Sequence, residues 1–292
     1  MQEGKKLNSY LHLHLIVFIW GFTAILGALI SLEALPLVWF RMLFASGFIL
    51  VYVIIKKIPL KLPAKTILSF LFAGLIIALH WFTFFKAIKV SNISVTLACL
   101  ATGAFFTSIL EPIFYKRKVI FYEVLFGLIV IAGLYLIFQV QGNYVDGIIL
   151  GLTSAFLSAL FSVINGKFAQ KYEPAVISFY EIFGGVLCLT VYLLFTASFT
   201  ACFFNLSTSD LLWLLVLSSV CTAYAFIASV RVMKYLSPYT VMLTINLEPI
   251  YGIILALLIF NEKEKMSPQF YVGALIILST VILNGVLKNR KK

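Results

Sequence analysis

Apolar residues fill most of the chain in long runs, which short polar connections separate. A helix needs about 20 predominantly apolar residues to cross a bilayer, because each residue adds about 1.5 Å and the hydrocarbon core is about 30 Å thick. The segments that meet this requirement are residues 11–32, 35–55, 66–86, 93–115, 119–138, 147–166, 174–196, 211–231, 239–260 and 269–287. The pattern predicts an all-α polytopic membrane protein with ten transmembrane helices.

The composition agrees with this interpretation. Hydrophobic residues make up 62% of the chain and charged residues 11%, whereas soluble domains are about half apolar and about a quarter charged. The sequence contains no H-E-x-x-H or G-x-S-x-G motif, no phosphate-binding loop and no Cys/His metal cluster. We therefore expect a protein that is not an enzyme and that needs no cofactor or metal.

Lysine and arginine are distributed unequally between the connections. Seventeen lie on one predicted side and four on the other, with Arg41 inside a span. Because cytoplasmic loops carry the excess of these residues, we expect a multi-pass protein of the plasma (cytoplasmic) membrane with both termini cytoplasmic. The same asymmetry accounts for the net charge of +11 without a nucleic-acid partner.

Two pairs of short stretches repeat at the same offset. Residues 86–91 resemble residues 232–237, and residues 121–127 resemble residues 267–273, both at an offset of 146. Five spans per copy is an odd number, so the second copy enters the membrane from the opposite face. We predict two inverted five-helix repeats, 1–140 and 141–292, which is an architecture of many secondary transporters.

The ninth predicted span carries polar residues near its middle. Asn246, Glu248 and Pro249 lie there, and a carboxylate at that depth costs about 2.5–3.5 kcal/mol on insertion scales. One interpretation is that Glu248 faces a cavity and binds a cation or a proton, while Pro249 breaks the helix and frees backbone carbonyls. The alternative is that Glu248 is protonated or paired with Arg41, and that the proline only shapes the helix.

Three further segments complete a family pattern. They are Leu247-Glu248-Pro249-Ile250-Tyr251, Phe260-Asn261-Glu262 and Gly273-Ala274-Leu275-Ile276-Ile277-Leu278. With the predicted topology, the whole chain resembles the EamA-type family of the drug/metabolite transporter superfamily. The resemblance implies a carrier of small metabolites or amino acids, often outward, through a cavity between the two halves. The first half departs from the pattern, because Pro249 falls on Gly103 at the offset of 146. We therefore expect a broken helix and a midplane carboxylate in the second half only.

Other charged residues inside predicted spans are candidates for contact with substrate. Arg41 lies six residues into the second span, where its planar fork could hold a carboxylate or its side chain could snorkel to the headgroups. Glu181, next to Tyr180, is the second-half counterpart of Arg41 to within two positions. The opposite charges indicate either a substrate with ammonium and carboxylate groups or a structural ion pair.

The third and sixth spans add polar and small residues. His80 and Trp81 lie in the third span, where the histidine could relay a proton or hydrogen-bond a neighbouring helix. Small residues recur every fourth position within residues 147–166, a pattern that favours close helix packing over ligand binding.

These features predict a secondary transporter that works by alternating access. Its substrate would be a small organic metabolite, an amino acid or related compound, moved more by export than by import, with a proton as one candidate coupling ion. The residues expected along the pathway are Glu248, Asn246, Pro249, Arg41, Glu181, Tyr180, His80 and Trp81. One alternative is proton-coupled efflux of cationic drugs, with Glu248 exchanging the proton. A membrane enzyme or a non-transporting receptor is a further alternative, which the missing motifs and the inverted repeat disfavour.

Overall fold

The computed structural model is built from helices. It describes residues 2–118, 125–126, 128–130, 132–133, 135–136 and 144–290, and no strand occurs among them. The helices of the first half are α1 (Gln2–Leu29), α2 (Ala34–Ile55), α3 (Ala64–Val90), α4 (Ile93–Leu100) and α5 (Gly103–Tyr115). Those of the second half are α7 (Val145–Phe168), α8 (Pro174–Phe195), α9 (Ala201–Phe204), α10 (Thr208–Ser218), η2 (Ser219–Tyr224), α11 (Ala225–Val232), α12 (Pro238–Ile245), α13 (Glu248–Phe260), η3 (Asn261–Glu264) and α14 (Pro268–Arg290).

Within the described residues, eight helical segments are long and apolar enough to cross a membrane. They coincide with the predicted spans except the fifth and the tenth. The fifth predicted span, 119–138, lies largely outside the described residues, and α14 provides a shorter apolar stretch, Pro268–Thr280. The all-helical, multi-pass prediction is therefore confirmed, while the count of ten stays a prediction.

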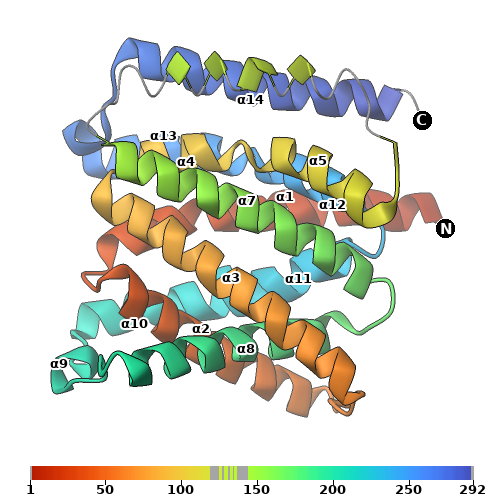
Figure 1. Ribbon diagram of the computed structural model, residues 1–292, viewed down its shortest axis with the longest axis vertical. Coiled ribbons are helices and arrows are strands. Elements are labelled where there is room, and N and C mark those ends of the chain that lie inside the picture. The colour runs from red at the N-terminus through yellow and green to blue at the C-terminus, as the bar shows by residue number, and fades with distance from the viewer. Residues whose placement is uncertain are drawn as a thin grey trace.

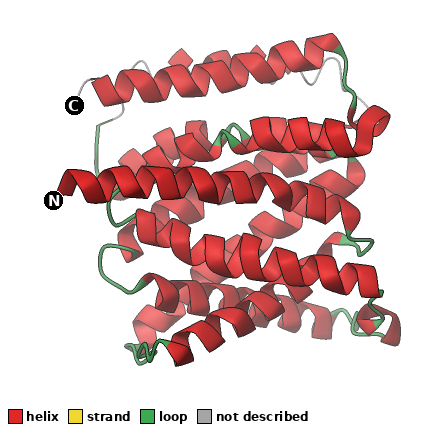
Figure 2. Cartoon of the chain, turned by 180° about the vertical axis from the view of Figure 1, so that it is seen from behind, coloured by secondary structure: helices red, strands yellow, loops and turns green. Residues whose placement is uncertain are grey.

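The long helices lie roughly side by side, so their connections gather at two ends of the bundle (Figure 1). Both termini lie at the same end, as Figure 2 also shows from behind. This end includes the connections 56–63, 116–118, 169–173 and 233–237, which carry much of the lysine and arginine. We call it the basic end, and we call the end with connections 30–33, 91–92, 196–207 and 261–267 the opposite end.

Small residues allow helices from the two halves to approach closely. At the crossing of α3 and α8, a Cβ added to Gly74 would overlap the carbonyl oxygen of Glu181 and lie 2.9 Å from the Gly185 nitrogen. On α7, a Cβ added to Gly151 would lie 2.9 Å from Cys99 Cβ on α4. The prediction of a packing seam on α7 is confirmed at its glycines.

Both halves contain a helix that is interrupted near its middle. α12 and α13 are separated at residues 246–247, and α4 and α5 are separated at residues 101–102. The four helices match in pairs at an offset of 145, so Glu248 corresponds to Gly103. The expectation of a broken helix in the second half only is therefore wrong.

Pro249 does not itself create the interruption of the second-half helix. It lies in the first turn of α13, where the backbone N–H that proline lacks would have no helical partner anyway. The first-half helix is interrupted at the same place with Ala104 at the corresponding position. The interruption is thus a property of the packed fold, and the proline is compatible with it.

The α3–α8 crossing predicts a specific sensitivity to one methyl group. Gly74→Ala should destabilise the protein by about 1–3 kcal/mol, because the new Cβ meets backbone atoms that cannot rotate away. Gly47→Ala is the matched control, since Gly47 is also helical and has nothing within 4 Å of an added Cβ; it should be neutral or stabilising by up to about 1 kcal/mol. Thermal unfolding in detergent measures both, and equal effects would contradict this account of the crossing.

Candidate functional site

A cavity lies between the two halves, lined by residues of α1, α2, α3, α4, α7, α11, α12 and α13. Four of the predicted pathway residues line it: Arg41, His80, Trp81 and Glu248. The cavity volume is about 60 Å³, measured as the space that the centre of a water molecule can occupy. Since about 10–15 Å³ on this measure holds one water, the cavity has room for a few waters and must widen to admit a metabolite.

Arg41 is the most deeply buried charge in the cavity wall, with 2% of its surface exposed. Its Nε donates a hydrogen bond to Thr222 Oγ1 at 2.7 Å, and its guanidinium carbon lies 3.8 Å from the ring centroid of Trp81. Its Nη1 is buried without a hydrogen-bond partner. This burial contradicts snorkelling of Arg41 to the headgroups. The geometry leaves one guanidinium nitrogen available to an anionic group.

A π-helical turn supplies the partner of Arg41. Between α10 and α11 the chain forms η2, in which Thr222 Oγ1 also donates to the Leu217 carbonyl, five residues earlier, at 2.7 Å. Trp20 Nε1 donates to the Cys221 carbonyl of the same turn at 3.1 Å. π-Helical turns occur frequently at functional sites. Here the turn directs a hydroxyl at a charge that would otherwise lack a partner.

Glu248 lies at the first turn of α13 and is 6% exposed. The N-terminus of a helix carries partial positive charge, which favours a carboxylate at this position. In the part of the chain that the structure describes, no hydrogen bond or ion pair involves the Glu248 side chain, so the predicted direct pairing with Arg41 is absent. Glu248 and Arg41 are instead two separate, opposite charges in the wall of one cavity.

His80 connects α3 to α7. Its Nδ1 lies 2.9 Å from the Ser154 carbonyl oxygen and 2.8 Å from Ser154 Oγ. A carbonyl only accepts, so Nδ1 carries the proton in this contact and Nε2 is the acceptor of a neutral ring. The predicted hydrogen bond to a neighbouring helix is confirmed. The residue also lines the cavity, with an acceptor nitrogen that the contact to Ser154 does not use.

The other four predicted pathway residues do not line the cavity. Glu181 is fully buried behind it and accepts a hydrogen bond from Asn165 Nδ2 at 3.1 Å, so the predicted Glu181–Arg41 ion pair is not formed. The Tyr180 hydroxyl donates to the Leu60 carbonyl at 2.9 Å. Asn246 directly follows α12 with its Nδ2 unpaired, and Pro249 is the second residue of α13. In this conformation none of these four side chains lines the cavity.

Three polar residues of α7 line the cavity and were not predicted as site residues. They are Ser158, Ser162 and Asn165. Their spacing of four and three residues places them on one helix face, and this face adjoins the small residues that pack against the first half. The sequence does show these polar residues next to the small residues of the same helix. Helix periodicity alone, however, does not show that this polar face borders a cavity.

Carboxylates join the two halves at the opposite end. Asp210 accepts hydrogen bonds from the backbone N–H and the hydroxyl of Ser31, each at 2.7 Å. Glu264 accepts from the backbone N–H groups of Ile93 at 3.0 Å and Ser94 at 2.9 Å, at the N-terminus of α4. Hydrogen bonds to charged groups contribute about 1.5–3 kcal/mol each, so this end is held closed firmly.

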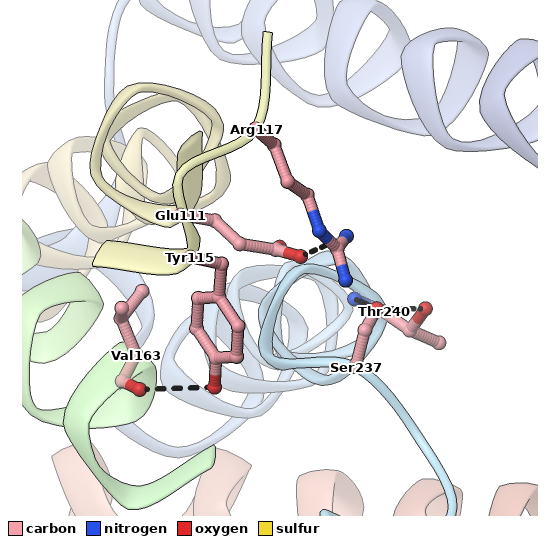
Figure 3. A network of polar contacts seen from close by, with 6 residues as sticks. All are labelled: Glu111, Tyr115, Arg117, Val163, Ser237 and Thr240. Atoms are coloured by element: carbon pink, nitrogen blue, oxygen red, sulfur yellow. Dashed lines mark hydrogen bonds and ion pairs between the residues drawn. The ribbon is translucent and has the colours of Figure 1, made fainter. Parts of the chain in front are cut away.

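The halves meet through weaker contacts at the basic end. Figure 3 shows the Tyr115 hydroxyl donating to the Val163 carbonyl, at 3.3 Å, and Glu111 paired with Arg117 at 2.8 Å beside the start of α12. The Glu111–Arg117 pair lies within the first half and does not join the halves. The hydrogen bonds between halves at this end that the structure describes have neutral acceptors, and those with neutral donors contribute about 0.5–1.5 kcal/mol each. Two charged groups also reach across at longer range: Arg231 Nη2 lies 3.5 Å from the Tyr52 hydroxyl, and Lys167 Nζ lies 5.4 Å from the Tyr115 ring centroid.

The comparisons with known proteins agree with this architecture. A family model described as the EamA-like transporter family matches residues 8–139 and 145–286. An uncharacterized transporter of Archaeoglobus fulgidus is 24% identical over 295 residues, which cover 96% of this chain and 97% of the relative. A protein crystal structure superposes with a TM-score of 0.71 at 14% identity, covering 98% of this chain and 99% of that one. At this identity the likeness shows the shared fold alone.

The Arg41–Thr222 contact predicts the effect of a hydroxyl deletion. Thr222→Val should destabilise the protein by about 1–3 kcal/mol, because it leaves the Arg41 Nε buried without an acceptor. Thr222→Ser keeps the hydroxyl and should cost clearly less. Thermal unfolding of the purified variants compares them. Equal losses would mean that the Thr222 methyl group, rather than its hydroxyl, supports the site.

Proposed function

Because the chain belongs to the EamA-like transporter family, we propose that it carries a small organic metabolite with both ammonium and carboxylate groups, such as an amino acid. The chain is a multi-pass integral membrane transporter rather than an enzyme, and its partners are a small-molecule substrate and the lipid bilayer. The observation that carries the proposal is the pair of opposite charges, Arg41 and Glu248, that line one cavity without a direct ion pair between them.

The cavity matches a zwitterionic ligand in several respects. The unpaired Nη1 of Arg41 suits a carboxylate, since a guanidinium binds this group with its planar fork. Glu248 suits an ammonium group. Ser158, Ser162 and the acceptor nitrogen of His80 add hydrogen-bonding groups, and Trp81 and Phe161 add apolar wall. Two charges that are otherwise costly in hydrocarbon are then neutralised by the substrate itself.

The proposed mechanism is alternating access between two inverted five-helix repeats, 1–140 and 141–292. The matching interruptions of α4–α5 and α12–α13 support the repeat. Discontinuous helices commonly surround the binding site in carriers of this architecture. Rocking of one half against the other would open the site to each side of the membrane in turn.

The asymmetry of the two ends favours export. The cavity wall extends to Met233 at the basic end, and the opposite end is closed by the Asp210 and Glu264 contacts. If the basic end is cytoplasmic in the plasma membrane, as the distribution of lysine and arginine predicts, substrate is loaded from inside. Uphill transport would draw on an ion gradient. Our candidate for the coupling ion is a proton, carried by Glu248 or His80.

The second candidate function is proton-coupled efflux of cationic drugs, favoured by the lack of a side-chain partner for Glu248 within the described residues. It requires Glu248 and does not require Arg41. The first candidate requires both charges. The two proposals therefore predict different results for one variant, Arg41→Gln, which should abolish binding only under the first candidate.

A thermal-shift screen against a metabolite library should separate the two candidates. An amino acid at about 100 times its Kd should stabilise the wild type by about 2.7 kcal/mol, and this shift should vanish in both Arg41→Gln and Glu248→Gln. Lys171→Gln, at an exposed position of the basic end, is the control and should keep the shift. A cation that still stabilises Arg41→Gln but not Glu248→Gln would identify the second function. Ligands insensitive to both variants would refute the proposed site.

The closure of the opposite end can be tested through Glu264. Glu264→Gln removes the charge at the start of α4, and we expect the conformation open at that end to become roughly tenfold more populated. The readout is the labelling rate of a cysteine introduced at Ser158, using an impermeant thiol reagent added from that side. A Cys202→Ser background is needed because Cys202 is exposed. Glu33→Gln is the control, since Glu33 is exposed at the same end and pairs weakly with Lys86 at 3.8 Å. Unchanged labelling in Glu264→Gln would show that this contact does not hold the gate.

A further inference from the structure

A second hollow lies outside the helix bundle, between α1 and α2 and over η2 and α11. Its volume is about 380 Å³. Phe48 and Ile49 of α2 form one wall, His12 of α1 lies on the other side, and Ala223 and Ile227 form the floor. In Figure 1, α11 lies between α1 and α2; α1 packs against α11, and α2 packs against η2. We call this hollow the lateral groove.

The polar side chains deep in the lateral groove are already hydrogen-bonded to protein. His12 Nε2 and the Tyr224 hydroxyl lie 2.9 Å apart, and Ser219 Oγ donates to the Leu215 carbonyl at 2.6 Å. A polar ligand would therefore find little to bind there. The remaining walls are apolar, so this part of the groove suits a hydrocarbon chain. In a bilayer, the hydrocarbon chains of lipids surround this surface of the protein.

The lateral groove has a cationic mouth at the basic end. Arg231, in the last turn of α11, is exposed there, and its Nη2 lies 3.5 Å from the Tyr52 hydroxyl. This long contact is the one hydrogen bond of the Arg231 side chain found in the described part of the chain. Its guanidinium therefore keeps donors for an anion in the headgroup region.

The length of the lateral groove matches one leaflet of a bilayer. Arg231 and Ser219 both line it and are twelve residues apart, which is about 18 Å along a helix axis. Half of the hydrocarbon core is about 15 Å. A chain that begins at a headgroup beside Arg231 would thus reach the end of the groove near the bilayer midplane.

We propose that the lateral groove binds one acyl chain of an anionic phospholipid from the leaflet at the basic end, with the lipid phosphate on Arg231 and the Tyr52 hydroxyl. The charge of the mouth, the apolar depth and the length each fit this class of ligand. The bound chain would pack against η2, the turn whose Thr222 holds Arg41. The lipid would therefore support the transport cavity from outside without entering it.

Native mass spectrometry of the full-length protein tests this proposal, after exchange into nanodiscs of equal phosphatidylglycerol and phosphatidylcholine and release into mild detergent. The wild type should retain one phosphatidylglycerol in preference to phosphatidylcholine. Arg231→Gln should lower this retention roughly fivefold, the effect of one basic residue near an anionic surface. Lys234→Gln is the control, because Lys234 is at the same end but pairs with Glu173 outside the groove, and it should retain the lipid.

A second variant tests the depth of the groove rather than its charge. Ala228→Leu narrows the floor and should reduce retention of both lipids, while size exclusion and thermal unfolding show that the variant is folded. Retention that is unchanged in Arg231→Gln, or equal for the two headgroups, overturns the proposal. A dimer mass that Ala228→Leu abolishes would assign the groove to a second copy of the chain and would also overturn it.

Discussion

A guanidinium buried in the interior of the helix bundle is the constraint on which the functional region depends. Arg41 is 2% exposed, and a charge at such depth is costly unless it is paired. The Thr222 hydroxyl and the face of Trp81 offset part of that cost, and they come from different helices. The cavity, the π-helical turn and the placement of Glu248 can all be understood as the surroundings of this one charge, which lacks a carboxylate partner within the described residues.

The two ends of the molecule are built with different strengths of interaction. Carboxylates of the second half accept hydrogen bonds from backbone N–H groups of the first half at the opposite end, whereas tyrosine hydroxyls and backbone carbonyls meet at the basic end. The interrupted helices between these ends match in position in the two halves. This combination suits a carrier that opens more readily at the basic end in the conformation described.

Local sequence signals anticipated the spans well and the site in part. Hydrophobic length decides whether a helix can cross a bilayer, so the eight spans coincide with their predicted segments. The interruption at 101–102 has no proline at the position of Pro249, so the signal used for the second half was missing there. Tyr180 and Asn246 were expected along the pathway and lie outside the cavity, because intramembrane polarity identifies an unusual residue but not the direction of its side chain.

The sequence by itself determined the helical membrane class, the unequal distribution of positive charge and the family, because these follow from composition, run length and short motifs. Tertiary structure alone decided which polar residues share a cavity. Arg41 and Glu248 are more than two hundred residues apart in the chain, and the partner of Arg41 depends on a π-helical turn that no glycine or proline marks. Such contacts arise from how helices of both halves pack, so no pattern within one helix could predict them.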